Sequence, residues 1–331
     1  MKRQLAALVV VATSLTACGG GGNSLVVYNG QHPQLTRLLV TAFERQTGIG
    51  VQLRNGDSLV VATQILSEGS ASPADVILSE NSPELANLEH HGLLRRLPPA
   101  TLGQIPAAYS SPTGRWVGVA LRVSSLVYDP ARIGRSELPQ SILELAEPRW
   151  RGKVAIAPTD SDFPPLVGAV IARYGAARAA VWLRGLKRNA ASYQDEEAVT
   201  AAVNRGDVAT GVINAYYWYR LRLEIGARGM HSVLHYFPDH DVGSIVNVAG
   251  AGVLVTSRHT AAAERFVAFL VGKTGQHIVA ESDDFEYPAR ANVAANAALP
   301  PFARTPHATV PVAALGDGRT AARLIREAGL A

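Results

Sequence analysis

Two apolar patterns alternate along the chain. Short runs rich in β-branched residues predict strands at residues 25–28, 51–53, 75–78, 126–128, 154–157, 208–213 and 244–254. Segments with helical spacing predict helices from Pro33 onward, at 60–66, 84–91, 163–174, 176–186, 196–204, through Arg220 and Leu223, and at 261–271, 275–280 and 320–328. In the helix after Pro33, one face would carry Leu35, Leu38, Leu39, Ala42 and Phe43. This alternation favours βαβ units and a largely parallel sheet.

The size of the chain adds a division into domains. A single core rarely grows beyond about 250–300 residues, so 331 residues favour two domains. The run at 244–254 is long and apolar, and it could cross between them. The pattern therefore fits either one large α/β protein or two α/β lobes joined by crossing strands, with a ligand cleft between the lobes.

The N-terminus predicts export and a lipid anchor. Lys2 and Arg3 precede a short apolar segment, which is typical of a secretory leader. The leader ends in Leu15-Thr16-Ala17-Cys18, which resembles the lipobox of bacterial lipoproteins. Cys18 is the only cysteine, and glycines follow it. We therefore expect a leader at 1–17, lipidation of Cys18 and a flexible tether at 18–24. The alternative is an ordinary leader with a chance cysteine.

Composition and charge exclude other classes. Hydrophobic residues make up 47% and charged residues 18%, as in a packed globular protein rather than a disordered one. The formal charge is +4, and Lys2 and Arg3 contribute two of these charges. The chain has no long basic run and no basic helix with interleaved aromatic residues, so nucleic acid is not an expected partner.

Candidate ligands follow the predicted strands. His32 comes after the first strand, Glu80 after the third, Asp160 after the strand at 154–157, and Tyr216 with Tyr217 after the strand at 208–213. Ligands of open α/β sheets bind at the carboxyl ends of the strands. Carboxylate and phenolate oxygens are hard donors that suit a ferric ion. One Glu and two phenolates would balance its three positive charges, and a neutral His adds none.

Each of these residues also has an ordinary interpretation. A single His in a loop is usually a surface residue, Glu80 could cap a helix, and a run of tyrosines is usually part of a core or an interface. Adjacent tyrosines cannot share a face of a regular element, so the pair needs an irregular turn or a helix start.

Five segments resemble the bacterial ferric-ion-binding proteins of ABC importers, and the likeness runs from about Leu25 to Leu330. They are Val26-Val27-Tyr28-Asn29-Gly30-Gln31-His32, Pro73-Ala74-Asp75-Val76, Trp150-Arg151-Gly152-Lys153, Ile213-Asn214-Ala215-Tyr216-Tyr217-Trp218-Tyr219 and Glu286-Tyr287-Pro288-Ala289-Arg290. The resemblance implies a periplasmic-binding-protein fold with a transferrin-like site. It implies Fe(III) as cargo, bound by His32, Glu80, Tyr216 and Tyr217.

The chain departs from that family where a small anion, commonly phosphate, completes the iron shell. The matching positions carry Asp160-Ser161-Asp162 and Glu196, while Asn214 is kept. Acids there would repel phosphate. We expect Asp160 or Glu196 either to bind the metal or to lie just behind its ligands, with Arg122 balancing their charge. The alternative is a one-residue slip that leaves Asp160 on the surface.

The resulting prediction is a substrate-binding lipoprotein of an ABC transporter, not an enzyme. It would act as a monomer outside the cell membrane with a permease and an ATPase as partners. The lobes would comprise 25–124 plus 247–298 and 125–246 plus 299–331, with hinges near 124–126 and 245–248. The rivals are a protein of the same fold for an iron chelate, a polyamine or a phosphonate, and a metal-dependent enzyme using Asp160, Glu196 and His32.

Overall fold

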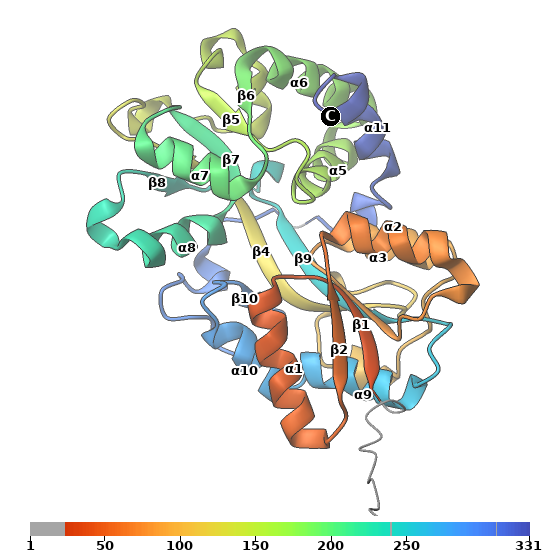
Figure 1. The fold of residues 1–331 in the computed structure, drawn as a ribbon. Helices are drawn as coiled ribbons and strands as arrows, with labels where there is room; N and C mark the ends of the chain where they lie inside the picture. Colours follow the sequence, from red (N-terminus) through yellow and green to blue (C-terminus); the bar gives the residue numbers. More distant parts are fainter. Residues whose placement is uncertain (1–23, 239, 309) are drawn as a thin grey trace, which may run out of the picture.

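A computed structural model describes residues 24–238, 240–308 and 310–331 (Figure 1). The predicted leader, Cys18 and most of the tether lie outside the described residues. Two α/β lobes lie one above the other in this view, and two long strands run between them. Among the described residues, we find no helix that combines the length and the apolar character needed to cross a membrane.

The strands form one mixed sheet with the order β2-β1-β3-β9-β4-β7-β5-β6, and β8 and β10 pair with β4. Their bounds are β1 Leu25–Gly30, β2 Val51–Asn55, β3 Val76–Ser79, β4 Val117–Tyr128, β5 Val154–Ile156, β6 Ala190–Ser192, β7 Thr210–Asn214, β8 Val233–His235, β9 Val246–Val253 and β10 Tyr287–Pro288. The outer pairs β1–β2, β1–β3, β5–β6 and β5–β7 are parallel. The pairs β3–β9, β4–β9 and β4–β7 are antiparallel. The prediction of a largely parallel sheet is therefore wrong at its centre.

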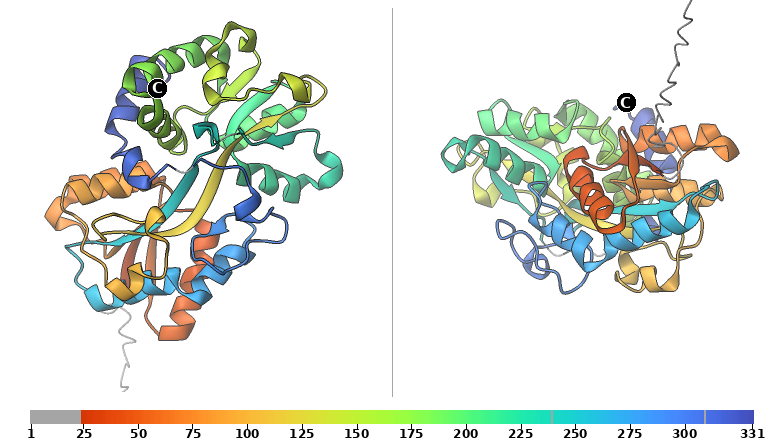
Figure 2. Two further views of the ribbon diagram at one scale, coloured as in Figure 1. Left: turned by 180° about the vertical axis from the view of Figure 1, so that it is seen from behind. Right: turned by 60° about the horizontal axis from the view of Figure 1, so that its bottom comes forward.

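The helices cover both lobes. Their bounds are α1 Pro33–Thr47, α2 Ser58–Glu68, α3 Ser82–His90, α4 Pro99–Leu102, α5 Phe163–Tyr174, α6 Ala176–Asn189, α7 Glu196–Arg205, α8 Ala215–Ile225, α9 Thr260–Val271, α10 Lys273–Glu281 and α11 Arg319–Glu327. We call the lobe with β1, β2, β3, α1, α9 and α10 the first lobe, and the lobe with β5, β6, β7, α5, α6 and α11 the second lobe (Figures 1 and 2).

Strands β4 and β9 link the lobes. Val117–Val123 of β4 pair with β9, whereas Ser124–Tyr128 pair with β7. Strand β4 therefore contributes one half to each lobe, and every residue of β4 is buried. The sequence predicted only the end of β4, because Arg122, Ser124 and Ser125 interrupt its apolar run. The strands β6, β8 and β10 were missed because each has only two or three residues.

The apolar core consists of two clusters. One cluster includes Val27, Phe43 and Ile77 in the first lobe, and the other includes Trp150 and Trp182 in the second lobe. The first cluster reaches across to Tyr216 and Tyr217. The prediction that Leu38 lies on the buried face of α1 is wrong. Leu38 is 53% exposed, because the buried face of α1 is formed by Leu35, Thr36, Leu39, Val40 and Phe43.

Candidate metal centre

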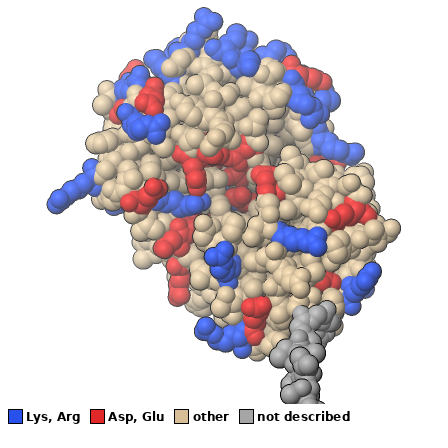
Figure 3. All heavy atoms as spheres, viewed as in Figure 1, with Lys and Arg blue, Asp and Glu red and all other residues tan. Residues whose placement is uncertain are grey.

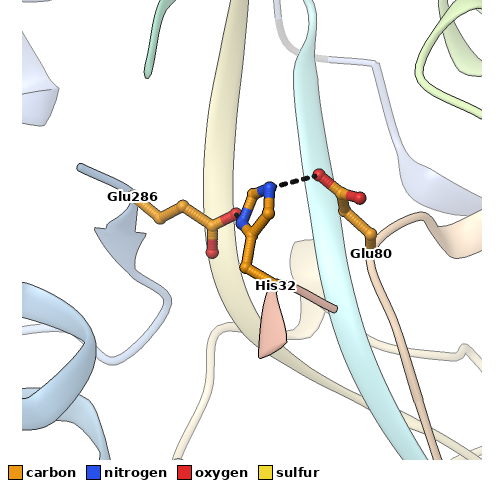
Figure 4. A group of neighbouring side chains, drawn as sticks. All are labelled: His32, Glu80 and Glu286. Carbon is orange, nitrogen blue, oxygen red and sulfur yellow. Dashed lines mark ion pairs between the residues drawn. The ribbon is translucent and has the colours of Figure 1, made fainter. Parts of the chain in front are cut away.

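Side chains from three distant parts of the chain meet between the lobes. His32, Glu80 and Glu286 each offer a ligand atom, and these atoms lie within 4.8 Å of one another. Figure 4 shows the His32 ring between the two carboxylates. His32 follows β1, Glu80 follows β3, and Glu286 precedes β10. A histidine with two carboxylates is a donor set for transition metals, so this group is a candidate metal centre.

The turn between β1 and α1 holds His32 in place. The Gln31 N–H donates to Asn29 Oδ1, and Asn29 Nδ2 donates to the Gln31 carbonyl at 2.8 Å. The His32 N–H in turn donates to Gln31 Oε1 at 2.7 Å. Pro33 then occupies the first turn of α1, where a missing N–H costs no hydrogen bond. These local bonds fix the backbone from which the imidazole projects.

Glu80 is fixed from the neighbouring α2. Ser58 Oγ donates to the Gly30 carbonyl and accepts from the Glu80 N–H, both at 2.9 Å. Glu80 Oε1 lies 2.7 Å from Arg122 Nη1 and 3.5 Å from His32 Nε2. One hydroxyl therefore ties the ends of β1 and β3 together beside the candidate ligands.

The tyrosine pair lies at the start of α8, as the sequence required. Asn214 is the N-cap, so Tyr216 and Tyr217 stand in the first turn, with ring centroids 4.0 Å apart and planes 32° apart. The Tyr216 hydroxyl lies 3.1 Å from Glu80 Oε1 and 3.3 Å from His32 Nε2. The structure thus brings Tyr216 of the second lobe against His32 and Glu80 of the first. Tyr217 is also buried, and it lines the adjoining cavity.

Several buried acidic groups surround one guanidinium at the centre. The fully buried Arg122 guanidinium faces Glu80, Asp162 at 3.2 Å and Glu286 at 3.6 Å. Burial, followed by the charge of Asp162, raises the pKa of Glu80 well above its usual value. Burial raises the pKa of Glu286 to about 7. A cation bound beside these acids would favour their ionised forms, so the centre is suited to a further positive charge.

Burial also favours the neutral forms of the other candidate ligands. It raises the pKa values of Tyr216 and Tyr217 well above 10, with the charge of Glu80 or Asp162 as the next cause. It lowers the pKa of His32 well below 6.5, and Arg220 and Arg122 add to this effect. A phenol in this environment loses its proton only to a strong cation, which is the role that a bound metal ion can take.

Asp160 and Glu196 lie beside the cleft rather than on open surface. The two Asp160 oxygens accept the N–H groups of Asp162 and Glu196, both at 3.1 Å. Glu196 Oε2 accepts the N–H of Asn214, and Asn214 Nδ2 lies 3.3 Å from it. Burial, followed by the charge of Asp162, raises the pKa of Asp160 to about 7 and that of Glu196 well above its usual value. These carboxylates are thus engaged by backbone groups.

A cavity of about 420 Å³ adjoins the centre. It is lined by residues of both lobes, including His32, Glu80, Asp160, Tyr217 and Arg220. Acidic side chains gather across the middle of this face, between the lobes (Figure 3). Asp57, Asp195 and Glu197 add to the acidic lining. The cleft would therefore attract cations.

Three acids of the centre were not assigned a role from the sequence. Glu286 opens one of the five segments that carry the resemblance, but neither it nor Asp284 was assigned a role, and both come more than 200 residues after His32. Asp162 was noted only as part of the stretch 160–162. Arg122 lies in the cleft, as the resemblance implied. Only the three-dimensional arrangement identifies these acids as neighbours.

Comparison with known proteins decides the family. The family described as bacterial extracellular solute-binding protein matches residues 71–306. The chain belongs to this family. It is 38% identical over 306 residues to the Fe(3+)-binding periplasmic protein of Serratia marcescens, which covers 92% of this chain and 90% of that protein. It is 34% identical over 326 residues to the major ferric iron-binding protein of Neisseria meningitidis serogroup B, which covers 97% of each.

A solved structure agrees with the fold of this solute-binding protein. Iron-bound HitA from Pseudomonas aeruginosa superposes with a TM-score of 0.89 at 39% identity, covering 93% of this chain and all of that one. The expected periplasmic-binding-protein fold with two lobes is confirmed. These relatives are binding proteins rather than enzymes by their names, so the interpretation as a metal-dependent enzyme is dropped.

Proposed function

We propose that this protein captures ferric iron between its lobes and delivers it to an ABC importer. The observation that carries the proposal is the meeting of His32 and Glu80 from the first lobe with Tyr216 from the second, within 3.5 Å of one another. Tyr217, whose ring lies 4.0 Å from that of Tyr216, would be the fourth ligand. Three relatives are named for ferric iron or were solved with iron bound.

Charge explains why a ferric ion suits this set better than a divalent ion. Glu80 and two phenolates would supply three negative charges, and the neutral imidazole of His32 adds a donor without charge. Burial favours the neutral forms of both phenols, so the cargo must displace their protons. A trivalent ion does this more readily than a divalent one because its field is stronger.

The test is the visible absorption spectrum of a soluble form that begins after Cys18. Adding ferric iron should produce a tyrosinate-to-iron charge-transfer band. The double variant Tyr216→Phe, Tyr217→Phe should lose the band. The control variant Tyr174→Phe should keep it, because Tyr174 is the last residue of α5 and its hydroxyl faces Asp241. A wild-type protein without any such band would overturn ferric binding.

The hydrogen bonds of Asp160 and Glu196 support iron binding without phosphate. Their carboxylates accept the backbone N–H groups of Asp162, Glu196 and Asn214, which would otherwise be free to bind an anion. We propose that the two acids support the loops behind the ligands rather than bind iron themselves. Iron affinity should then be independent of phosphate in the wild type. The double variant Asp160→Ser, Glu196→Asn should acquire a phosphate dependence, and its absence would contradict this role.

A chelated cargo is the second candidate. The cavity beside the centre continues toward a groove of about 740 Å³, and Tyr217 and Arg220 line both. This space exceeds that of a bare ion, and Arg220, which pairs with Glu197 at 2.9 Å, is a cationic side chain that lines both spaces. Equilibrium titration with ferric citrate and with weakly complexed ferric iron distinguishes the two, because a chelate cargo would be retained together with its citrate.

The proposal also includes a lipid anchor at Cys18 and a membrane permease with its ATPase as partners, with the protein acting as a monomer. The lipobox-like tetrapeptide supports the anchor. In a bacterial host, the Cys18→Ala variant should partition into the soluble fraction, whereas the wild type should remain with membranes. Equal partitioning of both would remove the anchor from the proposal.

A further inference from the structure

The Nδ1 atom of His32 has no role in the metal centre described above. Its Nε2 atom faces Tyr216 and Glu80, and Nδ1 points the other way. Nδ1 is buried and has no hydrogen-bond partner among the described residues. Two carboxylate oxygens lie 3.7 Å from it, one from Asp284 and one from Glu286. A small rotation of the ring would bring Nδ1 within bonding distance of either oxygen.

Glu286 is poorly placed to bind the cargo itself. Its Oε1 lies 3.6 Å from Arg122 Nη1, which is also 2.7 Å from Glu80 Oε1. The two carboxylates share this guanidinium, but Glu80 lines the adjoining cavity with its side chain 12% exposed, whereas the Glu286 side chain is fully buried and does not line it. Glu286 Oε2 accepts Gln31 Nε2 at 3.0 Å. Both oxygens of this fully buried carboxylate thus face cationic or donor groups.

Gln31 closes a small ring of contacts around the imidazole. Its Oε1 accepts the N–H of His32 at 2.7 Å, while its Nε2 donates to Glu286. Glu286 in turn faces Nδ1 of His32. The backbone and the side chain of His32 are therefore linked to one carboxylate through the preceding residue. This arrangement fixes the backbone of His32 relative to the carboxylate that its Nδ1 atom faces.

An imidazole that offers a lone pair to a metal is neutral and carries a single ring proton. That proton lies on Nδ1 or on Nε2. On Nδ1 it points at two carboxylates, and Nε2 keeps its lone pair. On Nε2 it points at the Tyr216 hydroxyl, and no lone pair is left for cargo. A carboxylate that accepts the far N–H of a metal-binding histidine is the usual device for selecting the productive form.

We propose that Asp284 and Glu286 are positioning residues that hold the proton of His32 on Nδ1 and direct the Nε2 lone pair into the cleft. The proposal rests on the proposed function only in that cargo binds at Nε2. It predicts an arrangement that exists before any cargo arrives, and that arrangement can be measured in the empty protein.

The first measurement is the tautomer of His32 in the cargo-free soluble protein, from nitrogen-15 shifts of labelled histidine assigned with a His32→Asn variant. We expect the Nδ1–H form to dominate in the wild type. Asp284→Ala and Glu286→Gln should each raise the share of the Nε2–H form, and the double variant should raise it most. Asp284→Ala is the milder change, because no described ion pair joins Asp284 to Arg122 and no described hydrogen bond joins it to Gln31.

The second measurement is ferric affinity from the charge-transfer titration. Each single variant should weaken binding by roughly 10-fold, and the double variant by up to about 100-fold. Glu44→Gln is the matched control, because Glu44 accepts the Val51 N–H at 2.8 Å near the far end of α1. It lies about 18 Å along the helix from His32 and should change neither the tautomer nor the affinity.

The outcomes separate the two proposals. A wild type in the Nε2–H form, or a tautomer that does not change in the double variant, overturns the positioning role whatever iron does. Loss of affinity in the variants with an unchanged tautomer also overturns it, since the acids would then affect binding by a route other than the tautomer. A wild type in the Nδ1–H form that shows no band with ferric iron supports the positioning role and instead overturns ferric cargo.

Discussion

Two buried carboxyls, Glu84 and Glu80, have raised pKa values although their partners differ. Glu84 of α3 is 6% exposed, and its Oε2 has no hydrogen-bond partner among the described residues. Burial raises its pKa to about 8; Asp57 and Asp162 add to the rise, and Arg122 opposes it. Glu84 is therefore a neutral acid inside the first lobe. Glu80 has a guanidinium at 2.7 Å, yet burial and the charge of Asp162 raise its pKa as well.

The raised pKa of Glu84 predicts how stability depends on pH. The folded state holds this proton up to pH about 8, while the unfolded chain releases it near 4.5. The contribution of Glu84 to stability is therefore full below 4.5 and is lost as the pH rises toward 8, at about 1.4 kcal/mol per pH unit. Glu84→Gln lacks this loss, so its stability relative to the wild type should rise across that range.

Urea unfolding of both proteins from pH 4.5 to pH 8.5 measures this difference. The exposed Glu137→Gln is the control and should follow the wild type at every pH. A Glu84→Gln advantage that is flat across the range would show that Glu84 titrates normally in the folded protein.

Within the first lobe, strand β1 and helix α2 approach each other closely. A Cβ added at Gly30, the last residue of β1, would lie 2.6 Å from both Cα and Oγ of Ser58. Ser58 is the first residue of α2, and its hydroxyl accepts the N–H of Glu80. The glycine at this strand end therefore lets α2 approach closely enough to position a candidate ligand that lies 50 residues away.

Gly30→Ala should lower both stability and iron affinity. Overpacking of this kind costs typically about 1–3 kcal/mol, and displacement of Ser58 should move Glu80 away from His32. Gly103→Ala is the control, since the added Cβ meets only the Pro99 carbonyl at 3.3 Å in a helical backbone. Urea unfolding and the charge-transfer titration report the two effects. Wild-type affinity in Gly30→Ala would contradict the link from β1 through Ser58 to Glu80.

The two lobes also contact each other directly across the cleft. Asn81, after β3 of the first lobe, donates through Nδ2 to Asp162 Oδ1 and to the Ser161 carbonyl, both at 3.1 Å. Asp162 Oδ1 also lies 3.2 Å from Arg122 Nη2. Asp162 stands at the start of α5 in the second lobe. A single carboxylate therefore joins the lobes beside the metal centre.

Removal of that carboxylate should favour an open molecule. Asp162→Ala is expected to increase the radius of gyration of the cargo-free protein in small-angle X-ray scattering, because the contacts to Asn81 and Arg122 are lost. Ferric iron should restore the compact form, since Tyr216 and Glu80 would still be bridged by the ion. Asp207→Ala, at an exposed pair with Arg205, should have no effect. An unchanged radius in Asp162→Ala would mean that the packing of β4 and β9 alone sets the closure.

The sequence predicted most of α1, α5, α7 and β9, because their apolar spacing is set locally by helix and strand periodicity. It could not predict the antiparallel centre of the sheet. The direction of β4 depends on which lobe each of its halves joins, and that is a property of the whole chain.

For the site, the sequence by itself determined which donors follow which strands: His32 after β1, Glu80 after β3 and the tyrosines after β7. The tertiary structure alone decided what surrounds them. Glu286 and Asp284 approach His32, and Asp162 joins Arg122, through packing between segments that share no local pattern. A pattern along the chain records only neighbours within a few residues, whereas the field at a buried imidazole depends on every charge within several ångströms.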